Sequence, residues 1–415
     1  MEELQQLIED ALRQVPRLAL EKRLAEKMRD AGLPTDKETL SKVAGHILSG
    51  SGESFIIEGD DDTEIQITDE DLAYVVTVSE RFYNEQLAGV LDQVSDKTAH
   101  QLQKYLTKKW PEEYAAHQVD VEAFKARLEH RWGKALGKLR MLLAIVREWS
   151  QHVYERRRAA GSGRLSHLDD VLLRLHVRAC QVTGEIILLL ENGYADGAMA
   201  RWRTLHEIAV VAAVITKFGE EMAERYVYYQ IVESFSALKA YERNHKALGF
   251  KPLSKAQSAK VREDHAKTLR RFGKNFGAEY GWAAHHLNAK EKEHVTFARL
   301  EEEAGNAMMR SPYKMASYNV HASPKGVYFK LGSLKGSPVL LAGMSNAGLT
   351  EPAQNAAVSL AEITWLVIGD SSIFEDVIAA KIVALLEAEI PVAFSKADKR
   401  LQRDERKHRE GTSKP

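Results

Sequence analysis

The sequence is almost free of cysteine, because Cys180 is the one thiol in 415 residues. This excludes an intrachain disulfide framework and any zinc site built on several thiolates. The residues around Cys180 have a helical pattern, in which a single cysteine is usually a small buried apolar residue.

Long apolar runs are also missing. The longest, residues 141–146 and 208–215, are far shorter than the ~20 residues that cross a membrane. The acidic N-terminus lacks the basic and apolar segments of a secretory signal. We therefore expect a soluble, cytoplasmic protein with no membrane partner.

No excess of charge is present, since 58 Lys and Arg stand against 59 Asp and Glu. A protein that coats a polyanion would be more basic, so contact with nucleic acid needs a local patch. Residues 262–274 offer basic side chains at helical spacing, although a solvated helix face is the more ordinary explanation.

Several motifs of common enzymes are absent. Phosphate-binding glycine loops and the G-x-S-x-G elbow are missing, which removes the main support for NTPases, dinucleotide-binding enzymes and α/β-hydrolases. His285, His286 and His294 have no acidic partner in register. We expect neither a metal site nor a cofactor.

The hydrophobic periodicity is helical nearly everywhere. Only two stretches alternate as strands do and are bounded by glycine, near residues 55–67 and 327–341. The sequence therefore predicts an all-α, multi-helix bundle with at most two small β-hairpins.

Composition suggests four parts. Residues 159–165 are small, basic and glycine-rich, and we interpret them as a linker between an N-terminal helical domain, 1–158, and a second one, 166–395. Residues 396–415 are charged and nearly without apolar side chains, which predicts a frayed or disordered tail that can be removed. A partner protein for the N-terminal domain and a homo-oligomer are both possible.

The most informative helix covers residues 197–215. Arg203, His206 and Glu207 lie at i, i+3 and i+4, so they share a face just before a half that is apolar all round. Charges in such a place must be paired or functional, because an isolated buried ion is very costly. An internal pair between Arg203 and Glu207 is the structural alternative to a site.

A second polar stripe lies at Tyr313, Ser317 and His321, at i, i+4 and i+8 of one helix. A single histidine there would more often be a satisfied core residue. Unpaired polar stripes in a dry core are costly. We therefore expect the two stripes to meet, with Arg203 paired to Glu207 and His321 within hydrogen-bond reach of one of them.

The chain resembles a known family at these positions, in the segments 203–207, 224–226, 300–305 and 313–323 and at Trp282. The segments look like the bacterial helical family numbered 5677 among domains of unknown function, over about residues 166–368. That family is thought to be similar to the helical HEPN ribonucleases of toxin and phage-defence systems. The resemblance therefore implies a HEPN-like helical fold and the location of a site.

The HEPN motif is an arginine followed by a histidine after four to six residues. Arg201 and His206 fit it, but Arg147 with His152 and Arg403 with His408 fit it too. About three such pairs are expected by chance in a chain of this composition, so the motif does not discriminate. Trp202 also stands where a polar residue usually follows the arginine.

Two functions follow from these observations. The first is a metal-independent endoribonuclease acting on RNA through a general base and a cation that stabilises the phosphorane. Its candidate catalytic residues are Arg203, Glu207, His321 and His206, and its candidate binding residues are Arg201, Arg225, Tyr313, Ser317 and Asn319. The alternative is a non-enzymatic helical interaction module, in which the polar cluster is a buried structural network. A sensor that binds an anionic ligand at Arg203 and Arg225 is a further form of this alternative.

Overall fold

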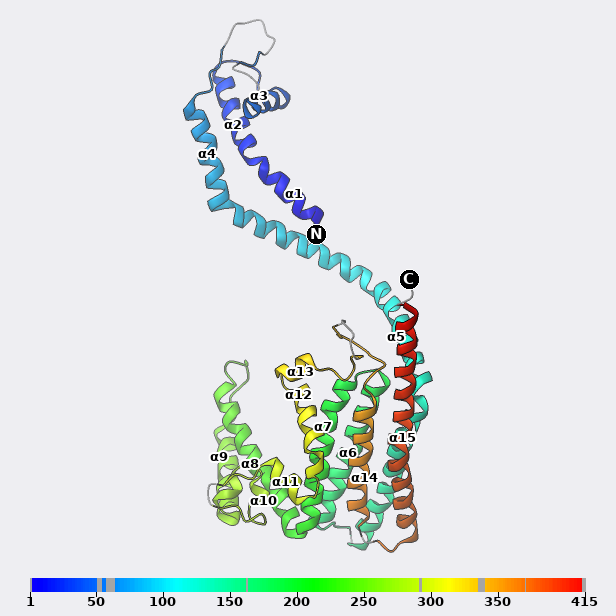
Figure 1. Ribbon diagram of the computed structural model, residues 1–415. Helices are drawn as coiled ribbons and strands as arrows, with labels where there is room; N and C mark the ends of the chain where they lie inside the picture. Colours follow the sequence, from blue (N-terminus) through cyan, green and yellow to red (C-terminus); the bar gives the residue numbers. More distant parts are fainter. Residues whose placement is uncertain are drawn as a thin grey trace. The chain divides into compact units, whose positions relative to one another are not determined.

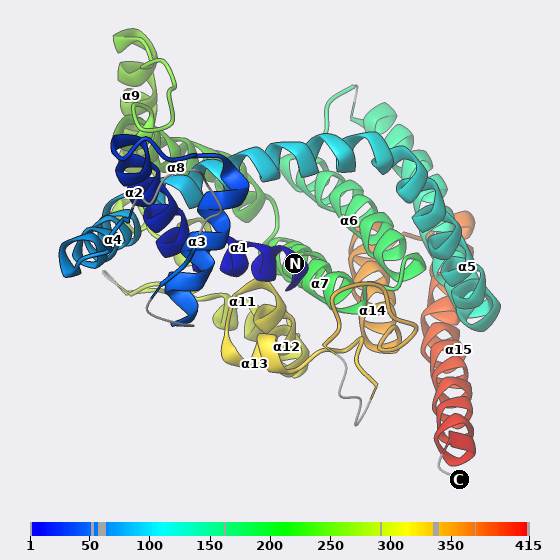
Figure 2. The same cartoon turned by 90° about the horizontal axis from the view of Figure 1, so that it is seen from above.

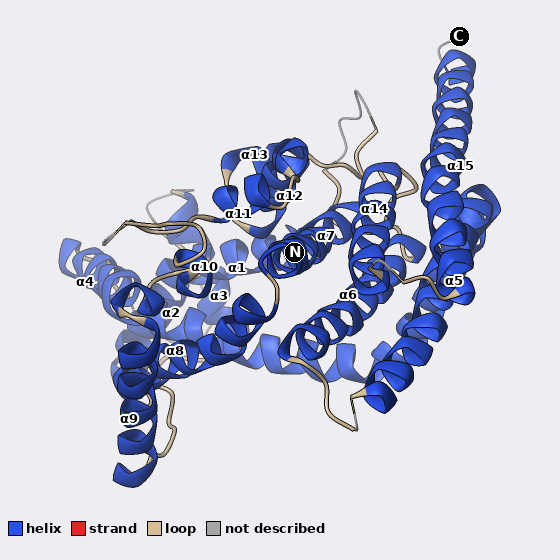
Figure 3. Ribbon diagram, turned by 90° about the horizontal axis from the view of Figure 1, so that it is seen from below, coloured by secondary structure: helices blue, strands red, loops and turns tan. Residues whose placement is uncertain are grey.

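The computed structural model describes residues 2–50, 54–56, 64–161, 163–290, 293–334, 340–369 and 371–412. Within these ranges the chain forms helices, turns and loops but no strand (Figures 1 and 3), which confirms the all-α prediction. Of the two expected hairpins, residues 57–63 and 335–339 lie outside the described residues. The described residues on either side of 57–63 are not extended into strands.

Where the second expected hairpin was to begin, residues 327 and 328 belong to a short helix, α13 (Pro324–Tyr328), and the described residues 329–334 form no strand. Ser323 caps it by accepting a hydrogen bond from the backbone N–H of Gly326, and Pro324 occupies the first turn, where proline is favourable. These local start signals outweigh the alternating pattern at 327–331.

By its contacts, the chain divides into two units, Met1–His117 and Gln118–Pro415. The division lies inside the long helix α5 (Leu87–Ala160) and differs from the predicted boundary at residues 159–165. The reason is that the second half of α5 buries Leu128, Trp132 and Leu139 in the core of the C-terminal unit. The glycine-rich segment is a turn between two helices of that unit.

The N-terminal unit packs its helices around a small core that includes Leu20, Leu24 and Val75. Asp71 is buried and accepts hydrogen bonds from Arg23 and from the backbone N–H of Thr68, the residue that caps α4. The elements are α1 (Glu2–Arg13), α2 (Val15–Asp30), α3 (Lys37–Ser49), α4 (Asp69–Arg81), the π-helical η1 (Phe82–Gln86) and the start of α5.

The C-terminal unit is built around α7 (Ala195–Phe218), which packs against α6 (His167–Glu191), α14 (Thr350–Ile368) and α12 (Arg310–Val320). Figure 2 shows α6, α7 and α14 side by side. The remaining elements are α8 (Glu220–Asn244), α9 (Lys255–Phe272), η2 (Lys274–Gly277), α10 (Gly281–Ala284), α11 (Phe297–Glu303), η3 (Ala307–Met309) and α15 (Phe374–Thr412).

Helix α7 is buried along its second half, as its apolar sequence predicts, with Ala209, Val210 and Val214 inaccessible to solvent. Its first half carries the polar residues, and Trp202 between them donates a hydrogen bond from Nε1 to Ser359 Oγ on α14, 3.1 Å away. The helix therefore places one polar surface at its N-terminal half against a dry core.

Of the two expectations for residues 396–415, a frayed helix or a disordered tail, the structure shows a helix as far as Thr412. Helix α15 continues to Thr412, Ala397 and Leu401 are buried, and Asp404 pairs with Arg131 of α5 at 2.8 Å. Ala397 and Leu401 lie at i and i+4, on one face of the helix, and their burial together with the ion pair of Asp404 docks this end of α15.

Cys180 is buried on α6, as predicted, with its Sγ 3.7 Å from His176 Nδ1. Burial raises the pKa of this thiol to about 12, so it is a packing group and not a nucleophile. None of the described helices combines the length and the apolar character that crossing a bilayer requires.

Candidate functional site

The polar half of α7 supplies the first stripe. Arg203 and Glu207 lie one turn apart and form an ion pair, with Arg203 Nε 3.0 Å from Glu207 Oε1. Their side chains are 25% and 35% exposed to solvent, so the pair lies at the boundary between core and solvent. The predicted pairing of these residues is confirmed.

Helix α12 supplies Tyr313, which joins the pair. Its hydroxyl donates to Glu207 Oε1 at 2.6 Å and accepts from Arg203 Nε at 3.0 Å. The Arg203 guanidinium also lies over the Tyr313 ring, 5.1 Å from its centroid. Arg203, Glu207 and Tyr313 therefore hold one another in a closed three-membered network.

His321 completes the group from the end of α12. The helix stops at Val320, the backbone of His321 turns into an extended conformation, and its Nε2 lies 3.5 Å from Arg203 Nη1. The histidine is exposed. The expectation that His321 comes within reach of the Arg203 pair is confirmed, and the cluster opens to solvent on the side of His321.

The electrostatics of the cluster follow from this geometry. Burial, and then the hydrogen bond to Glu207, raise the pKa of Tyr313 above the usual range of a phenol. Burial and the negative charge of Glu207 also raise the pKa of Tyr280 to about 12. Burial alone would lower the pKa of Arg203, but the interactions with Tyr313 and Glu207 outweigh it, and the pKa is raised overall. Arg203 is thus a permanent cation beside a solvent-exposed imidazole.

Beneath this open cluster lies a sealed one. His206 Nε2 is 2.9 Å from Glu301 Oε1, and both side chains are 1% exposed. Arg310 pairs with the other oxygen of Glu301 at 2.6 Å and lies over the Tyr313 ring, 5.6 Å from its centroid. Burial lowers the pKa of His206 in spite of its carboxylate partner. A substrate cannot touch this imidazole, so the structure does not place His206 among groups that react.

The structure also separates the two members of the HEPN-like pair. Arg201 pairs with Glu185 of α6 and donates to Thr204 Oγ1 at 3.3 Å, whereas His206 bonds Glu301 of α11. Residues five apart on a helix lie on different faces, which explains their separation. Arg201 therefore lies outside the cluster of Arg203 and His321.

Arg225, the other predicted anion ligand, is a buried structural residue of α8. Its Nε donates to the backbone carbonyl of Trp282 at 3.0 Å, and its guanidinium lies over the rings of Phe272 and Phe276, 5.2 and 5.3 Å from their centroids. Burial lowers its pKa. It does not join Arg203 in an anion site.

Two further predicted residues lie on α12 without meeting the charged pair. Ser317 Oγ donates back to the Tyr313 carbonyl at 2.9 Å, a bond within its own helix. Asn319 is partly buried, and none of the hydrogen bonds of the described residues involves its side chain. Of the second stripe, therefore, only Tyr313 and His321 contact the pair of Arg203 and Glu207 among the described residues.

Sequence reasoning missed Glu301 and Arg310. Glu301 belongs to a run of three glutamates, 301–303, and only the burial of one of them distinguishes it from its neighbours. Arg310 begins α12 one turn before Tyr313, so the i, i+3 spacing was a usable signal for it.

The described residues hold no group of three or more His, Cys, Asp or Glu side chains arranged as metal ligands. His285 and His286 are edge to face, 5.2 Å between centroids, and His286 Nε2 lies 3.5 Å from Glu221.

Comparison with known proteins adds one finding. Residues 169–337 match the model of a family described as a family of unknown function, DUF5677. The match lies within the range of the resemblance seen in the sequence and contains Arg203, Glu207, Tyr313 and His321. No curated protein and no solved structure matches the chain.

Proposed function

We propose that the protein is a metal-independent endoribonuclease whose reacting groups are His321 and Arg203. The observation that supports this most is the 3.5 Å contact between an exposed imidazole and a guanidinium fixed from behind by Glu207 and Tyr313. A base beside an immobilised cation at a solvent boundary is the minimum that cleavage of an RNA phosphodiester requires.

The proposed reaction is an internal transfer. His321 Nε2 accepts the proton of a ribose 2′-hydroxyl, whose oxygen attacks the adjacent phosphorus. Arg203 stabilises the negative charge that develops on the phosphoryl oxygens. The bond between phosphorus and the 5′-oxygen breaks, and the 5′-oxygen takes a proton from water. The hydroxide so formed takes the proton from His321, which restores the base, and a 2′,3′-cyclic phosphate remains. The protein residues alone supply the base and the charge.

In this scheme Glu207 and Tyr313 are positioning residues. Glu207 accepts from Arg203 Nε and from the Tyr313 hydroxyl, so the remaining guanidinium N–H groups face His321 and solvent. Cleavage of cellular RNA by this site would give the protein the toxin or phage-defence role that the sequence resemblance implied for a bacterial chain.

The test combines growth and stability. Induced expression of the wild-type chain in bacteria should arrest growth, and purified protein should cleave unstructured RNA in the presence of EDTA. His321→Ala should abolish both effects while the melting temperature stays unchanged, because the side chain is exposed. His152→Ala, which removes an exposed histidine of α5, is the matched control. Cleavage that survives His321→Ala, or that EDTA abolishes, contradicts the proposal.

The alternative is a helical interaction or ligand-sensing module. The sealed pair of His206 and Glu301, which the partly exposed Arg310 joins, favours it, because such a network is what a purely structural role requires. Under this function purified protein cuts no RNA, and His321→Ala changes neither growth nor stability.

A further inference from the structure

The connection between α8 and α9 concentrates positive charge. Residues 239–262 contain seven Lys or Arg and one Glu, in a chain whose net charge is −1. We call residues 241–262 the α8–α9 tip. Glu242 is paired with Arg262 at 2.5 Å. Across the described residues, no ion pair involves three exposed lysines of the tip, Lys246, Lys251 and Lys255.

This differs from the basic strip that the sequence suggested further along α9. There, Lys267 pairs with Glu263 at 2.6 Å and Arg271 with Glu224 at 2.5 Å. Lys267 and Arg271 are therefore neutralised by their neighbours, whereas no ion pair of the described residues involves the exposed Arg270 and Lys274 at the end of that strip. The tip differs in that three unpaired lysines belong to one short connection.

The tip also presents aromatic rings in parallel. Tyr241 is stacked with His245 at 5.7 Å and with Phe250 at 6.3 Å, with interplanar angles of 12° and 5°. The Tyr241 hydroxyl donates to the Lys251 carbonyl at 2.7 Å, which fixes the connection against α8. Phe250 remains 55% exposed. The rings form a fixed platform with one open end.

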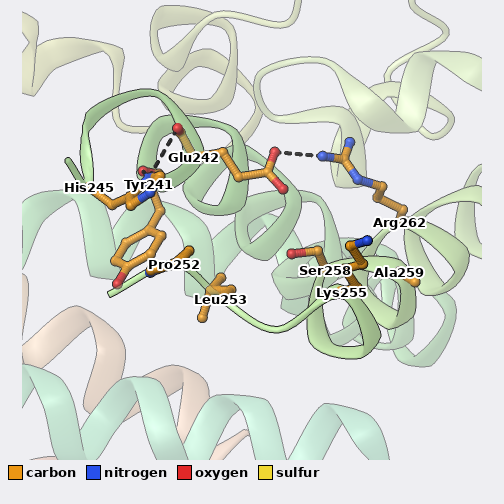
Figure 4. Close-up of a pocket in the computed structure, with 9 residues that line it drawn as sticks. All are labelled: Tyr241, Glu242, His245, Pro252, Leu253, Lys255, Ser258, Ala259 and Arg262. Atoms are coloured by element: carbon orange, nitrogen blue, oxygen red, sulfur yellow. Dashed lines mark hydrogen bonds and ion pairs between the residues drawn. The ribbon is translucent and has the colours of Figure 1, made fainter. Parts of the chain in front are cut away.

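A cavity of about 390 Å³ lies beside these rings. Figure 4 shows Tyr241, His245 and Pro252 together on one side and the ion pair of Glu242 and Arg262 on the other. The volume is within the range of small-ligand sites. An aromatic wall opposite charged groups fits a planar base attached to a phosphate.

We propose that the α8–α9 tip binds single-stranded RNA, with bases stacked on the ring platform and phosphates held by Lys246, Lys251 and Lys255. Stacking on aromatic side chains beside a basic surface is how proteins hold single strands without reading their sequence. An anionic membrane would use the same charge together with Phe250 and the exposed Leu248. It has no use for parallel rings beside a cavity that contains the ion pair of Glu242 and Arg262, so the observations favour RNA.

The position of the tip suits an RNA substrate. Figure 1 shows the α8–α9 connection and the α12–α13 segment, which contains His321, at the same end of the C-terminal unit. A bound strand can therefore extend from the tip toward the cluster of Arg203 and His321. Only this extension toward the cluster rests on the proposed ribonuclease function. Binding at the tip does not, because it can be measured with RNA that is not cleaved.

Binding is tested with a fluorescein-labelled oligouridine in which every 2′-hydroxyl is methylated, so that the strand has no internal nucleophile. Anisotropy titrations of the full chain at several salt concentrations give the affinity and its salt dependence. The triple variant Lys246→Gln, Lys251→Gln, Lys255→Gln should bind at least about tenfold more weakly, and the slope of log K against log salt should fall by about 2, as expected for three phosphate contacts. Phe250→Ala should weaken binding about tenfold through lost stacking.

A variant with equal charge loss provides the control. Lys399→Gln, Arg400→Gln, Arg403→Gln removes three exposed cations from α15 in the same unit and should leave binding unchanged. Equal loss of affinity in both triple variants overturns the proposal, because it shows non-specific attraction. Absence of binding by the wild type overturns it as well. So does binding to phosphatidylserine vesicles that the tip variant loses while RNA binding persists.

The outcomes for the tip and for the ribonuclease are separable. If the wild type binds the methylated strand through the tip but does not cut unmodified RNA, the ribonuclease proposal fails and the tip proposal stands. If RNA is cut at the cluster while the tip variants bind as the wild type does, the tip proposal fails and the ribonuclease proposal stands.

Discussion

His206 and Glu301 face each other inside the protein, with Nε2 2.9 Å from Oε1 and only 1% of each side chain exposed. Burial lowers the pKa of His206 and so favours the neutral imidazole, whose Nε2–H donates to the carboxylate. Arg310 compensates the charge of Glu301 from the other side. A buried carboxylate with two such partners fastens α7, α11 and α12 to one another.

Removing Glu301 should therefore destabilise the protein strongly. Glu301→Ala leaves His206 and Arg310 without their acceptor, and loss of one partner from a buried network costs about 3–5 kcal/mol. Denaturant unfolding followed by circular dichroism measures the change. Glu301→Gln, which keeps an acceptor for His206, should lose less.

Glu303→Ala is the control for this helix. Glu303 pairs with Lys217 at 2.9 Å, but the two side chains are 33% and 50% exposed, and surface pairs contribute less than about 1 kcal/mol. If both alanine variants unfold at the same denaturant concentration, Glu301 does not have the role assigned to it.

Acid should destabilise the protein through His176. Its Nε2 lies 3.1 Å from Thr364 Oγ1, and burial lowers its pKa from 6.5 to about 4. Between these two values the unfolded chain binds a proton that the folded one excludes, so the free energy of unfolding falls as the pH decreases from about 6.5 to 4. The shift corresponds to about 3 kcal/mol at most. Burial of His206 acts in the same direction.

The variant His176→Leu separates this effect from other titrations. Leucine has a similar volume and no proton to bind, and Thr364 keeps its own bond to the Leu360 carbonyl at 2.7 Å. The free energy of unfolding of the variant should depend less steeply on pH between 4 and 6.5 than that of the wild type. Parallel curves for the two proteins rule out His176 as the titrating group.

The sequence was sufficient to predict which residues share a helix face. The spacing of Arg203 and Glu207 led to their ion pair. The expected meeting of Tyr313 and His321 with this pair is also found, although α12 ends at Val320 and His321 approaches from an extended backbone and not from the helix. The same spacing does not reveal how deeply each side chain is buried. His206 shares the face of Arg203 in sequence, but its ring is buried against residues far along the chain, such as Glu301, 95 residues later.

Local composition was a weaker guide to domains. Glycine near residue 161 correctly indicated a turn, but whether a turn separates domains depends on what the preceding helix contacts. The second half of α5 packs on the later helices, through Trp149 and Asp376 for example, joined at 2.9 Å. Such long-range packing has no signal in the residues that surround the turn.

The end of α15 should contribute to stability. Deleting residues 396–415 removes the buried side chains of Ala397 and Leu401 and the partner of Arg131, so the melting temperature should fall clearly. Leu401→Ala in the full chain should account for about 2 kcal/mol of the loss, as expected for truncation of a buried leucine. Deleting only residues 411–415 should have little effect. Equal melting temperatures for the wild type and the longer deletion would restore the view of a dispensable tail.

Tyr313→Phe tests whether the network that holds Arg203 matters to the proposed reaction. The change removes one hydroxyl, which donates to Glu207 at 2.6 Å and accepts from Arg203 at 3.0 Å, and keeps the ring under both guanidinium groups. Stability should fall by about 1 kcal/mol, the usual contribution of one hydrogen bond. RNA cleavage should fall about tenfold, because a less constrained cation stabilises the phosphorane less well.

Tyr318→Phe is the matched control for that variant. Tyr318 is also partly buried on α12, and its hydroxyl takes part in none of the hydrogen bonds found among the described residues. Cleavage and stability should both match the wild type. A merely structural role for Tyr313 predicts that cleavage per folded molecule is unchanged in Tyr313→Phe. Single-turnover rates measured well below the melting temperature decide between the two roles, because they report the reacting site and not the amount of folded protein.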